Sequence, residues 1–171
     1  TQLRLLWMVN NGASDLTPLA GLTGLKTLEA GHNEIVELGP LAGLQALTTL
    51  SLPDNAVVEV TPLAGLTELV TLDISGNEVV SIDALAGASS LVTLIANDNE
   101  ISAAQLGSLP ALLDLQLQNN ALTGLGGLKG LGGLMRLYVD DNTISDLAPL
   151  VGLPQLEWLS VRRNELTSIG P

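Results

Sequence analysis

The sequence predicts an α/β solenoid of about eight similar coils, with a parallel β-sheet on one side and short 3₁₀ or helical turns on the other. First, an asparagine recurs every 22 residues, with one step of 21. Second, leucine stands five and eight residues before each asparagine, and apolar residues stand three before and two after. Third, Pro and Gly interrupt the leucine-rich connecting stretches. The asparagines are Asn11, Asn33, Asn55, Asn77, Asn99, Asn120, Asn142 and Asn164.

The strands are predicted just before each asparagine. There an apolar side chain occupies every second position, as Leu28 and Ala30 do on either side of Glu29. Such alternation is typical of a strand with one buried face. Each asparagine is expected to point inward at the end of its strand. Its side chain would hydrogen-bond turn backbone that is otherwise buried without a partner.

The return segments are predicted to hold short 3₁₀ or helical turns. Residues 16–22 and 60–66 place leucine, or Val60 in the second stretch, at every third position, while Pro and Gly prevent a long helix. The glycine-rich residues 124–133 predict a looser return segment, because each Gly raises the entropy cost of ordering. One coil cannot bury its leucines alone, so stability must come from stacking neighbouring coils.

The composition excludes several classes of function. A net charge of −12 repels polyphosphate and anionic lipid, so we expect no nucleic-acid partner. The chain has no cysteine and one histidine, His32, which we expect to be a solvated surface group. No apolar stretch is long enough for a membrane span. We therefore expect no cofactor, no metal site and no membrane insertion, and a core of aliphatic side chains.

The run Leu25-x-x-Leu28-x-Ala30-x-x-Asn33-x-Ile35 resembles the leucine-rich-repeat motif, and the pattern covers essentially the whole chain. The 22-residue length and the phrase Thr-Pro-Leu-Ala-Gly-Leu-Thr resemble the internalin type of bacterial surfaces, although intracellular phosphatase regulators share this length class. The resemblance implies a leucine-rich-repeat solenoid, a curved right-handed superhelix whose concave sheet is the usual partner surface. It favours an extracellular or bacterial-surface location, with a cytoplasmic one as the alternative.

Residues 1–171 are predicted to form a single leucine-rich-repeat domain without its terminal caps. Terminal repeats need a polar outer face. This chain begins inside a repeat with Leu3, Leu5 and Trp7, and stops at residues 169–171, at the start of another return segment. We expect a fragment of a longer protein, whose ends meet further repeats, caps or another chain. A preceding segment is expected to cover Trp7.

The outward strand positions form the candidate binding surface, here called the sheet face. It comprises the side chains six, four, two and one residues before each repeat asparagine. Eight strands about 4.8 Å apart span roughly 34 Å, enough for a protein interface. All three aromatic residues of the chain fall on this face, and Trp, Tyr and Arg most often dominate interface energies. The predicted partner-binding residues, here called the C-terminal cluster, are Asp114, Arg136, Tyr138, Trp158, Arg162 and Arg163.

The C-terminal cluster also has a purely structural interpretation. Each arginine adjoins an aspartate in its row, so cross-strand ion pairs of small energetic value could explain all three. The pairs would be Arg136 with Asp114, Arg162 with Asp140, and Arg163 with Asp141. Trp158 could instead pack against a following repeat.

The middle of the sheet face suggests further hypotheses. No Lys or Arg occurs from residue 27 to residue 128, whereas twelve carboxylates do. This favours a basic partner or a cation, or simply serves solubility. Calcium could meet oxygens of Asp98, Asn119 and Asp141, although a dedicated Asp-rich loop is missing. One row of threonines could suit ice or a polysaccharide, or reflect the preference of threonine for strands. These are Thr27, Thr49, Thr71 and Thr93.

Catalysis is not expected on this surface. Glu29 and Asp73 lie in one row two strands apart, about 10 Å, near the carboxylate separation of inverting glycosidases. An open sheet lacks the burial that would raise the pKa of one carboxyl group and make it an acid. The sequence therefore favours a non-catalytic protein-binding module. An intracellular scaffold or phosphatase-regulator-like repeat and a carbohydrate or ice binder are the alternatives.

Overall fold

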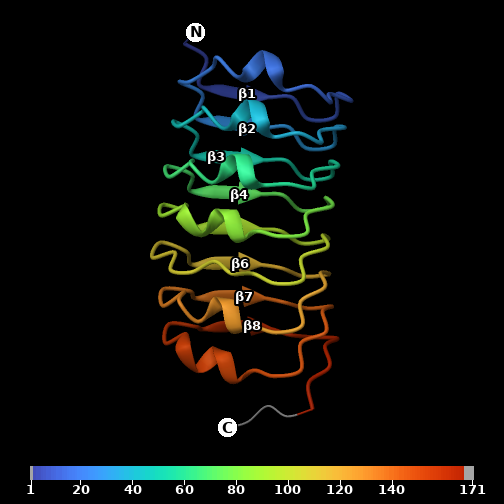
Figure 1. Cartoon of the computed structure of the whole chain (residues 1–171), viewed down its shortest axis with the longest axis vertical. Helices are drawn as coiled ribbons and strands as arrows, with labels where there is room; N and C mark the ends of the chain where they lie inside the picture. Colours follow the sequence, from blue (N-terminus) through green and yellow to red (C-terminus); the bar gives the residue numbers. More distant parts are fainter. Residues whose placement is uncertain (1, 168–171) are drawn as a thin grey trace.

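The computed structural model describes residues 2–167 and consists of coils stacked along its long axis (Figure 1). Each coil contributes one three-residue strand to a single parallel sheet, in which the strands follow their order in the chain. The predicted solenoid is confirmed. The predicted stop at residues 169–171 lies outside the described residues. The strands are β1 Leu5–Trp7, β2 Thr27–Glu29, β3 Thr49–Ser51, β4 Thr71–Asp73, β5 Thr93–Ile95, β6 Asp114–Gln116, β7 Arg136–Tyr138 and β8 Trp158–Ser160.

Short 3₁₀ helices form on the return side, as predicted. Pro occupies the first turn of η1, η2, η3 and η6, where its fixed φ suits a helix start. η4 and η5 form without Pro, and no 3₁₀ helix is found between β5 and β6 in the described chain. That connection belongs to the one coil that is a residue shorter. The helices are η1 Thr17–Leu19, η2 Gly39–Leu41, η3 Thr61–Leu63, η4 Asp83–Gly87, η5 Gly126–Leu128 and η6 Ala148–Gly152.

Two glycines of the glycine-rich return segment lie against the preceding return segment, whereas a Cβ atom added at Gly124, Gly126 or Gly132 would have nothing within 4 Å. A Cβ atom added at Gly127 would lie 2.1 Å from the carbonyl oxygen of Ala104. A Cβ atom at Gly130 would lie 2.1 Å from the carbonyl oxygen of Gly107. These two glycines therefore allow the sixth return segment to contact the backbone of the fifth.

The core fills the space between the sheet and the 3₁₀ helices. In β2 to β5 the central leucine is buried and its two neighbours are partly exposed, as the alternation predicts. The buried hydrophobic residues of the described chain are all Leu, Ile, Val or Ala. An aliphatic core explains why the aromatic residues are left for outward positions.

The repeated asparagines tie each coil to its neighbour, which confirms their predicted structural role. Asn77 Oδ1 accepts a hydrogen bond from the Val57 N–H at 2.9 Å. Its Nδ2 donates to three carbonyl groups at 3.0 Å each, those of Leu52, Ile74 and Ser75. Equivalent bonds are formed by Asn33, Asn55, Asn99, Asn120, Asn142 and Asn164.

Candidate partner-binding site

The strand register aligns the predicted outward rows across the sheet. Residues that share an offset from the repeat asparagine are direct partners in every strand pair. The row six before the asparagine is Leu5, Thr27, Thr49, Thr71, Thr93, Asp114, Arg136 and Trp158. The row four before it is Trp7, Glu29, Ser51, Asp73, Ile95, Gln116, Tyr138 and Ser160. Side chains within a row are therefore cross-strand neighbours.

The C-terminal cluster occupies the last three strands, β6 to β8, and the loop that follows β8. Trp158 on β8 is 56% exposed, and its direct partner on β7 is Arg136. Tyr138 is half-buried between Gln116 and Ser160 in the adjacent row. The register thus brings both aromatic side chains and Arg136 together on neighbouring strands.

Arg136 and Asp114 form the predicted cross-strand ion pair. Arg136 Nε donates to Asp114 Oδ2 at 2.7 Å, and this hydrogen bond raises the pKa of the Arg136 guanidinium. Asp114 is only 8% exposed, although its position is an outward one. Gln116 Nε2 donates to the other Asp114 oxygen at 3.2 Å, and Asn97 Nδ2 donates to Gln116 Oε1 at 3.4 Å. Polar side chains linked by hydrogen bonds, from Asn97 just after β5 through Gln116 to Asp114 on β6, therefore orient Arg136 on β7.

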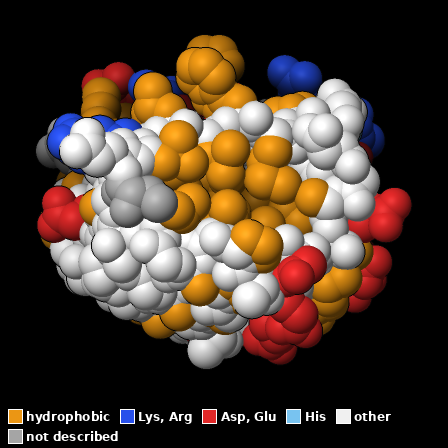
Figure 2. Space-filling view, turned by 90° about the horizontal axis from the view of Figure 1, so that it is seen from above, with side chains coloured by type: hydrophobic (Ala, Val, Ile, Leu, Met, Phe, Trp, Pro, Cys, Tyr) orange, Lys and Arg blue, Asp and Glu red, His pale blue; other side chains and the backbone are white. Residues whose placement is uncertain are grey.

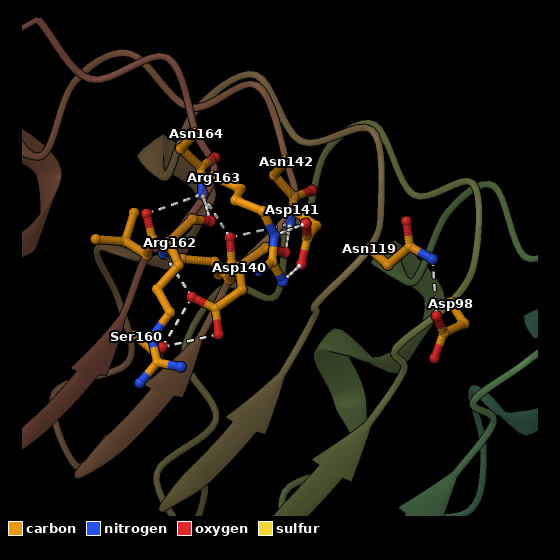
Figure 3. A network of polar contacts seen from close by, with 11 residues as sticks. Asp98, Asn119, Asp140, Asp141, Asn142, Ser160, Arg162, Arg163 and Asn164 are labelled. Carbon is orange, nitrogen blue, oxygen red and sulfur yellow. Dashed lines mark hydrogen bonds and ion pairs between the residues drawn. The ribbon is translucent and has the colours of Figure 1, made fainter.

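Arg163 and Asp141 form the second predicted pair. The Arg163 Nε and Nη2 groups donate to the two oxygens of the Asp141 carboxylate (Figure 3). This hydrogen bonding holds the pKa of the Asp141 carboxyl below its usual value and raises the pKa of Arg163. The Arg163 side chain nevertheless remains 72% exposed. The pair is therefore a surface feature that leaves most of the guanidinium accessible.

The third predicted pair, between Arg162 and Asp140, does not form. The backbone N–H of Arg162 donates to Asp140 Oδ1 at 2.5 Å, and Ser160 Oγ bonds both Asp140 oxygens at 2.7 and 2.8 Å. No dashed line joins the Arg162 guanidinium to Asp140 in Figure 3. The carboxylate is bound by a hydroxyl and a backbone donor instead. The interpretation that all three arginines form ion pairs is therefore wrong at Arg162.

One row of the sheet face, which includes Arg163 of the C-terminal cluster, has a left-handed backbone. Every residue immediately before a repeat asparagine has a positive φ, which only Gly, Asn and Asp adopt at low cost. The row is Asn10, His32, Asp54, Gly76, Asp98, Asn119, Asp141 and Arg163. Arg163, at φ 49°, is a residue type that this conformation does not favour.

The three residues of the calcium hypothesis do not direct their oxygens toward a common point in the structure. Asn119 Nδ2 donates to Asp98 Oδ1 at 2.7 Å, while Asp141 is bound by Arg163 (Figure 3). Within residues 2–167 no three His, Asp or Glu side chains are grouped to hold a metal ion. His32 Nδ1 lies 3.2 Å from Asp54 Oδ2, and both side chains are more than half exposed. His32 is thus a surface group, as expected.

The remaining hypotheses concern residues at the middle of the face. The threonines from Thr27 to Thr93 are direct partners in a half-buried row, and Glu29 and Asp73 flank Ser51 in the next row. Both rows therefore lie as predicted. No helix in the described chain is long and apolar enough to cross a membrane.

The first coil presents three exposed apolar side chains on the sheet face. Trp7 is 67% exposed, and Leu5 and Val9 beside it are also exposed on the sheet face. Figure 2 shows apolar side chains gathered at the N-terminal end of the stack. The described residues thus include no segment that covers Trp7.

Sequence reasoning missed several polar residues that shape the cluster. Ser160, Gln116 and Asn97 each lie in an outward row, and each bonds a residue of the adjacent row. Their closeness to these partners across adjacent rows is the signal that could have identified them. The backbone donor of Arg162 leaves no such signal, because every residue except proline has one.

Comparison with known proteins identifies the family. No protein-family model matches the chain, and no curated protein sequence matches it significantly. Among solved structures, internalin C2 of Listeria monocytogenes is 32% identical, with a TM-score of 0.90. That match covers 98% of this chain and 74% of internalin C2.

The chain belongs to the internalin family of leucine-rich-repeat proteins. The internalin InlF of Listeria monocytogenes shares its fold, with a TM-score of 0.93 and 24% identity over 98% of this chain. This internalin-family chain spans only 50% of the InlF chain. The fold also matches the ectodomain of the plant receptor kinase GASSHO1/SCHENGEN3 from Arabidopsis thaliana, in complex with CASPARIAN STRIP INTEGRITY FACTOR 2. That match has a TM-score of 0.78 and 24% identity, and covers 90% of this chain and 20% of the ectodomain.

The ion pair of this internalin-family chain between Arg136 and Asp114 should contribute to stability. Replacing Arg136 with alanine is expected to lower the Tm, because the Asp114 carboxylate would stay largely buried without its cation. Adding Asp114→Ala should recover part of the loss. Thermal unfolding followed by circular dichroism measures both changes. Asp54→Asn, which removes a charge from an exposed contact, is the control and should leave the Tm unchanged. An equal Tm for Arg136→Ala and the wild type would contradict the expectation.

Proposed function

We propose that this chain is a non-catalytic protein-binding module whose sheet face contacts a partner through the C-terminal cluster. The observation that carries the proposal is the exposed indole of Trp158, which lies on the strand next to Tyr138 and Arg136. A large apolar ring in solvent has no stabilising role in the described coils. Trp, Tyr and Arg are also the residues that most often supply binding hot spots.

The architecture supports this function in two further ways. The asparagine bonds join the backbones of neighbouring coils, so the backbone that carries the outward side chains needs little ordering upon binding. Membership of the internalin family supports a recognition role. The same fold also occurs in a receptor ectodomain solved in complex with CASPARIAN STRIP INTEGRITY FACTOR 2. A concave partner surface and an extracellular or bacterial-surface location accord with that likeness. The full-length sequence would distinguish this location from a cytoplasmic one.

The aromatic pair should dominate partner binding. A phage-displayed library of random dodecapeptides, selected on the wild-type chain, provides ligands for the test. The double variant Trp158→Ala and Tyr138→Ala should weaken the selected peptides by at least about tenfold, because the loss of a hot spot typically costs more than that. Surface plasmon resonance measures the affinities.

Two variants serve as controls for that result. Val151→Ala also truncates an exposed apolar side chain, but it lies in η6 and should leave binding unchanged. Thr71→Tyr with Thr93→Tyr blocks the threonine row and should matter only if this row binds a carbohydrate or ice. Undiminished affinity of Trp158→Ala with Tyr138→Ala would exclude the C-terminal cluster as the contact site.

A further inference from the structure

We propose that Arg162 and Arg163 form a carboxylate-binding pair that docks an acidic segment of the protein partner. The proposal rests on the function proposed above and specifies the chemistry of the partner. It depends on the hydrogen bonds and backbone conformations of these two neighbouring arginines. Both are exposed, and they stand in adjacent rows at the C-terminal end of the sheet face.

Arg162 is held through its backbone N–H, and its side chain has no ion-pair partner within residues 2–167. Asp140, the nearest carboxylate in its row, is occupied by the Arg162 N–H and by Ser160 Oγ. No ion pair of the Arg162 guanidinium is found among the described residues. An unpaired guanidinium offers five N–H donors in a planar fork that fits a carboxylate. The hydrogen bond to Asp140 thus fixes the backbone of Arg162 and does not involve its guanidinium N–H groups.

Arg163 occupies a backbone conformation that stability alone would not select. Its φ of 49° is left-handed, and the equivalent position is Asn, Asp or Gly in all other coils except that of His32. Its contact with Asp141 uses Nε and Nη2, which leaves the Nη1 donors for a second carboxylate. A residue kept in an unfavourable conformation is often retained for function. Asp141 would then orient Arg163 for binding.

Charge elsewhere on the molecule restricts where an acidic segment can dock. The chain carries a net charge of −12, and no Lys or Arg occurs between residues 27 and 128. All three arginines of the sheet face lie at its C-terminal end, beside Asp140 and Asp141. An acidic segment is therefore repelled from the middle of the face and finds guanidinium donors only at the C-terminal end. Trp158 lies on β8, the strand that precedes the two arginines in the chain, and presents an exposed apolar side chain on the same coil. The expected ligand is a peptide segment with Asp or Glu next to an apolar residue.

The dodecapeptide library tests this assignment directly. Peptides selected on the wild-type chain should be enriched in Asp and Glu. The double variant Arg162→Gln and Arg163→Asn should bind them at least about tenfold more weakly, because two charge-assisted contacts are lost. The matched control Lys26→Gln and Lys129→Gln also removes two positive charges from exposed sites, but outside the sheet face, and should bind the peptides as the wild type does.

Stability separates a binding role of Arg163 from a structural one. Arg163→Asn alone should have a Tm equal to or above that of the wild type, because Asn adopts a left-handed conformation more readily. A Tm loss that accompanies the binding loss would overturn the proposal, as would equal weakening by the lysine control. Selected peptides that depend on Trp158 and Tyr138 but carry no acidic residues would also overturn it, while leaving the proposed function intact. Peptides insensitive to the aromatic pair would instead contradict the proposed function.

Discussion

Replacing Asn77 with alanine is expected to lower the free energy of unfolding by about 1–3 kcal/mol for the orphaned Val57 N–H alone. Asn77 is 8% exposed, and Val57 is completely buried. Alanine offers no acceptor to this N–H, and water has no access to replace it. The Asn77 amide also binds backbone of two successive coils, so its loss weakens the contact between them. Urea unfolding followed by circular dichroism measures the change.

The aspartate variant isolates the donor half of the same side chain. Asn77→Asp keeps an acceptor for the Val57 N–H, but it places an oxygen where Nδ2 donates to three carbonyl groups. Repulsion between the carboxylate and these carbonyl oxygens disfavours the ionised form. The folded-state pKa of this new carboxyl is therefore expected to lie above its unfolded value of about 3.9. Its stability should therefore be lowest at neutral pH and should recover as the pH falls through the raised pKa.

Asn11 provides the matched control for both Asn77 variants. It is exposed in the first coil, and its side chain donates only to the Val9 carbonyl at 3.0 Å in the described structure. Asn11→Ala should therefore change the free energy of unfolding much less than Asn77→Ala. Equal effects at both positions would show that the asparagine bonds between coils contribute little to stability.

Replacing Gly127 with alanine is expected to lower the free energy of unfolding by about 1–3 kcal/mol, the usual cost of inserting a group into a packed site. The new Cβ atom would meet the Ala104 carbonyl oxygen at 2.1 Å and its carbon at 2.8 Å. These are backbone atoms, so they cannot move aside as the end of a side chain would. Two return segments would have to separate. Urea unfolding gives the size of the effect.

The preceding glycine offers a control that differs by a single position. Gly126 lies in the same 3₁₀ helix, η5, but a Cβ atom there would have nothing within 4 Å. Gly126→Ala should leave stability unchanged or raise it by about 0.4–1 kcal/mol, because alanine restricts the unfolded chain. If both variants were equally stable, the close contact between the fifth and sixth return segments would be absent in solution.

Much of the candidate site could be predicted from the sequence. In a parallel sheet with equal repeats, residues at the same offset from the repeat asparagine lie next to one another on neighbouring strands. The exposed positions of Trp158 and Arg136 could be read from their offsets before the repeat asparagine, as could the pairing of Arg136 with Asp114. The burial of Asp114 could not be read in this way. It depends on the guanidinium that lies over it and on the amide of Gln116, whose rotamers the spacing does not specify.

The sequence by itself determined the solenoid, the strands and the role of the asparagines in this protein. Apolar side chains that repeat at one spacing can be buried together only if successive coils stack in register. Only the tertiary structure decided that Asp140 binds Ser160 and the Arg162 backbone, and that Gly127 lies against a neighbouring carbonyl. These contacts depend on backbone hydrogen-bond directions and on separations of a few ångströms, and residue order does not specify either.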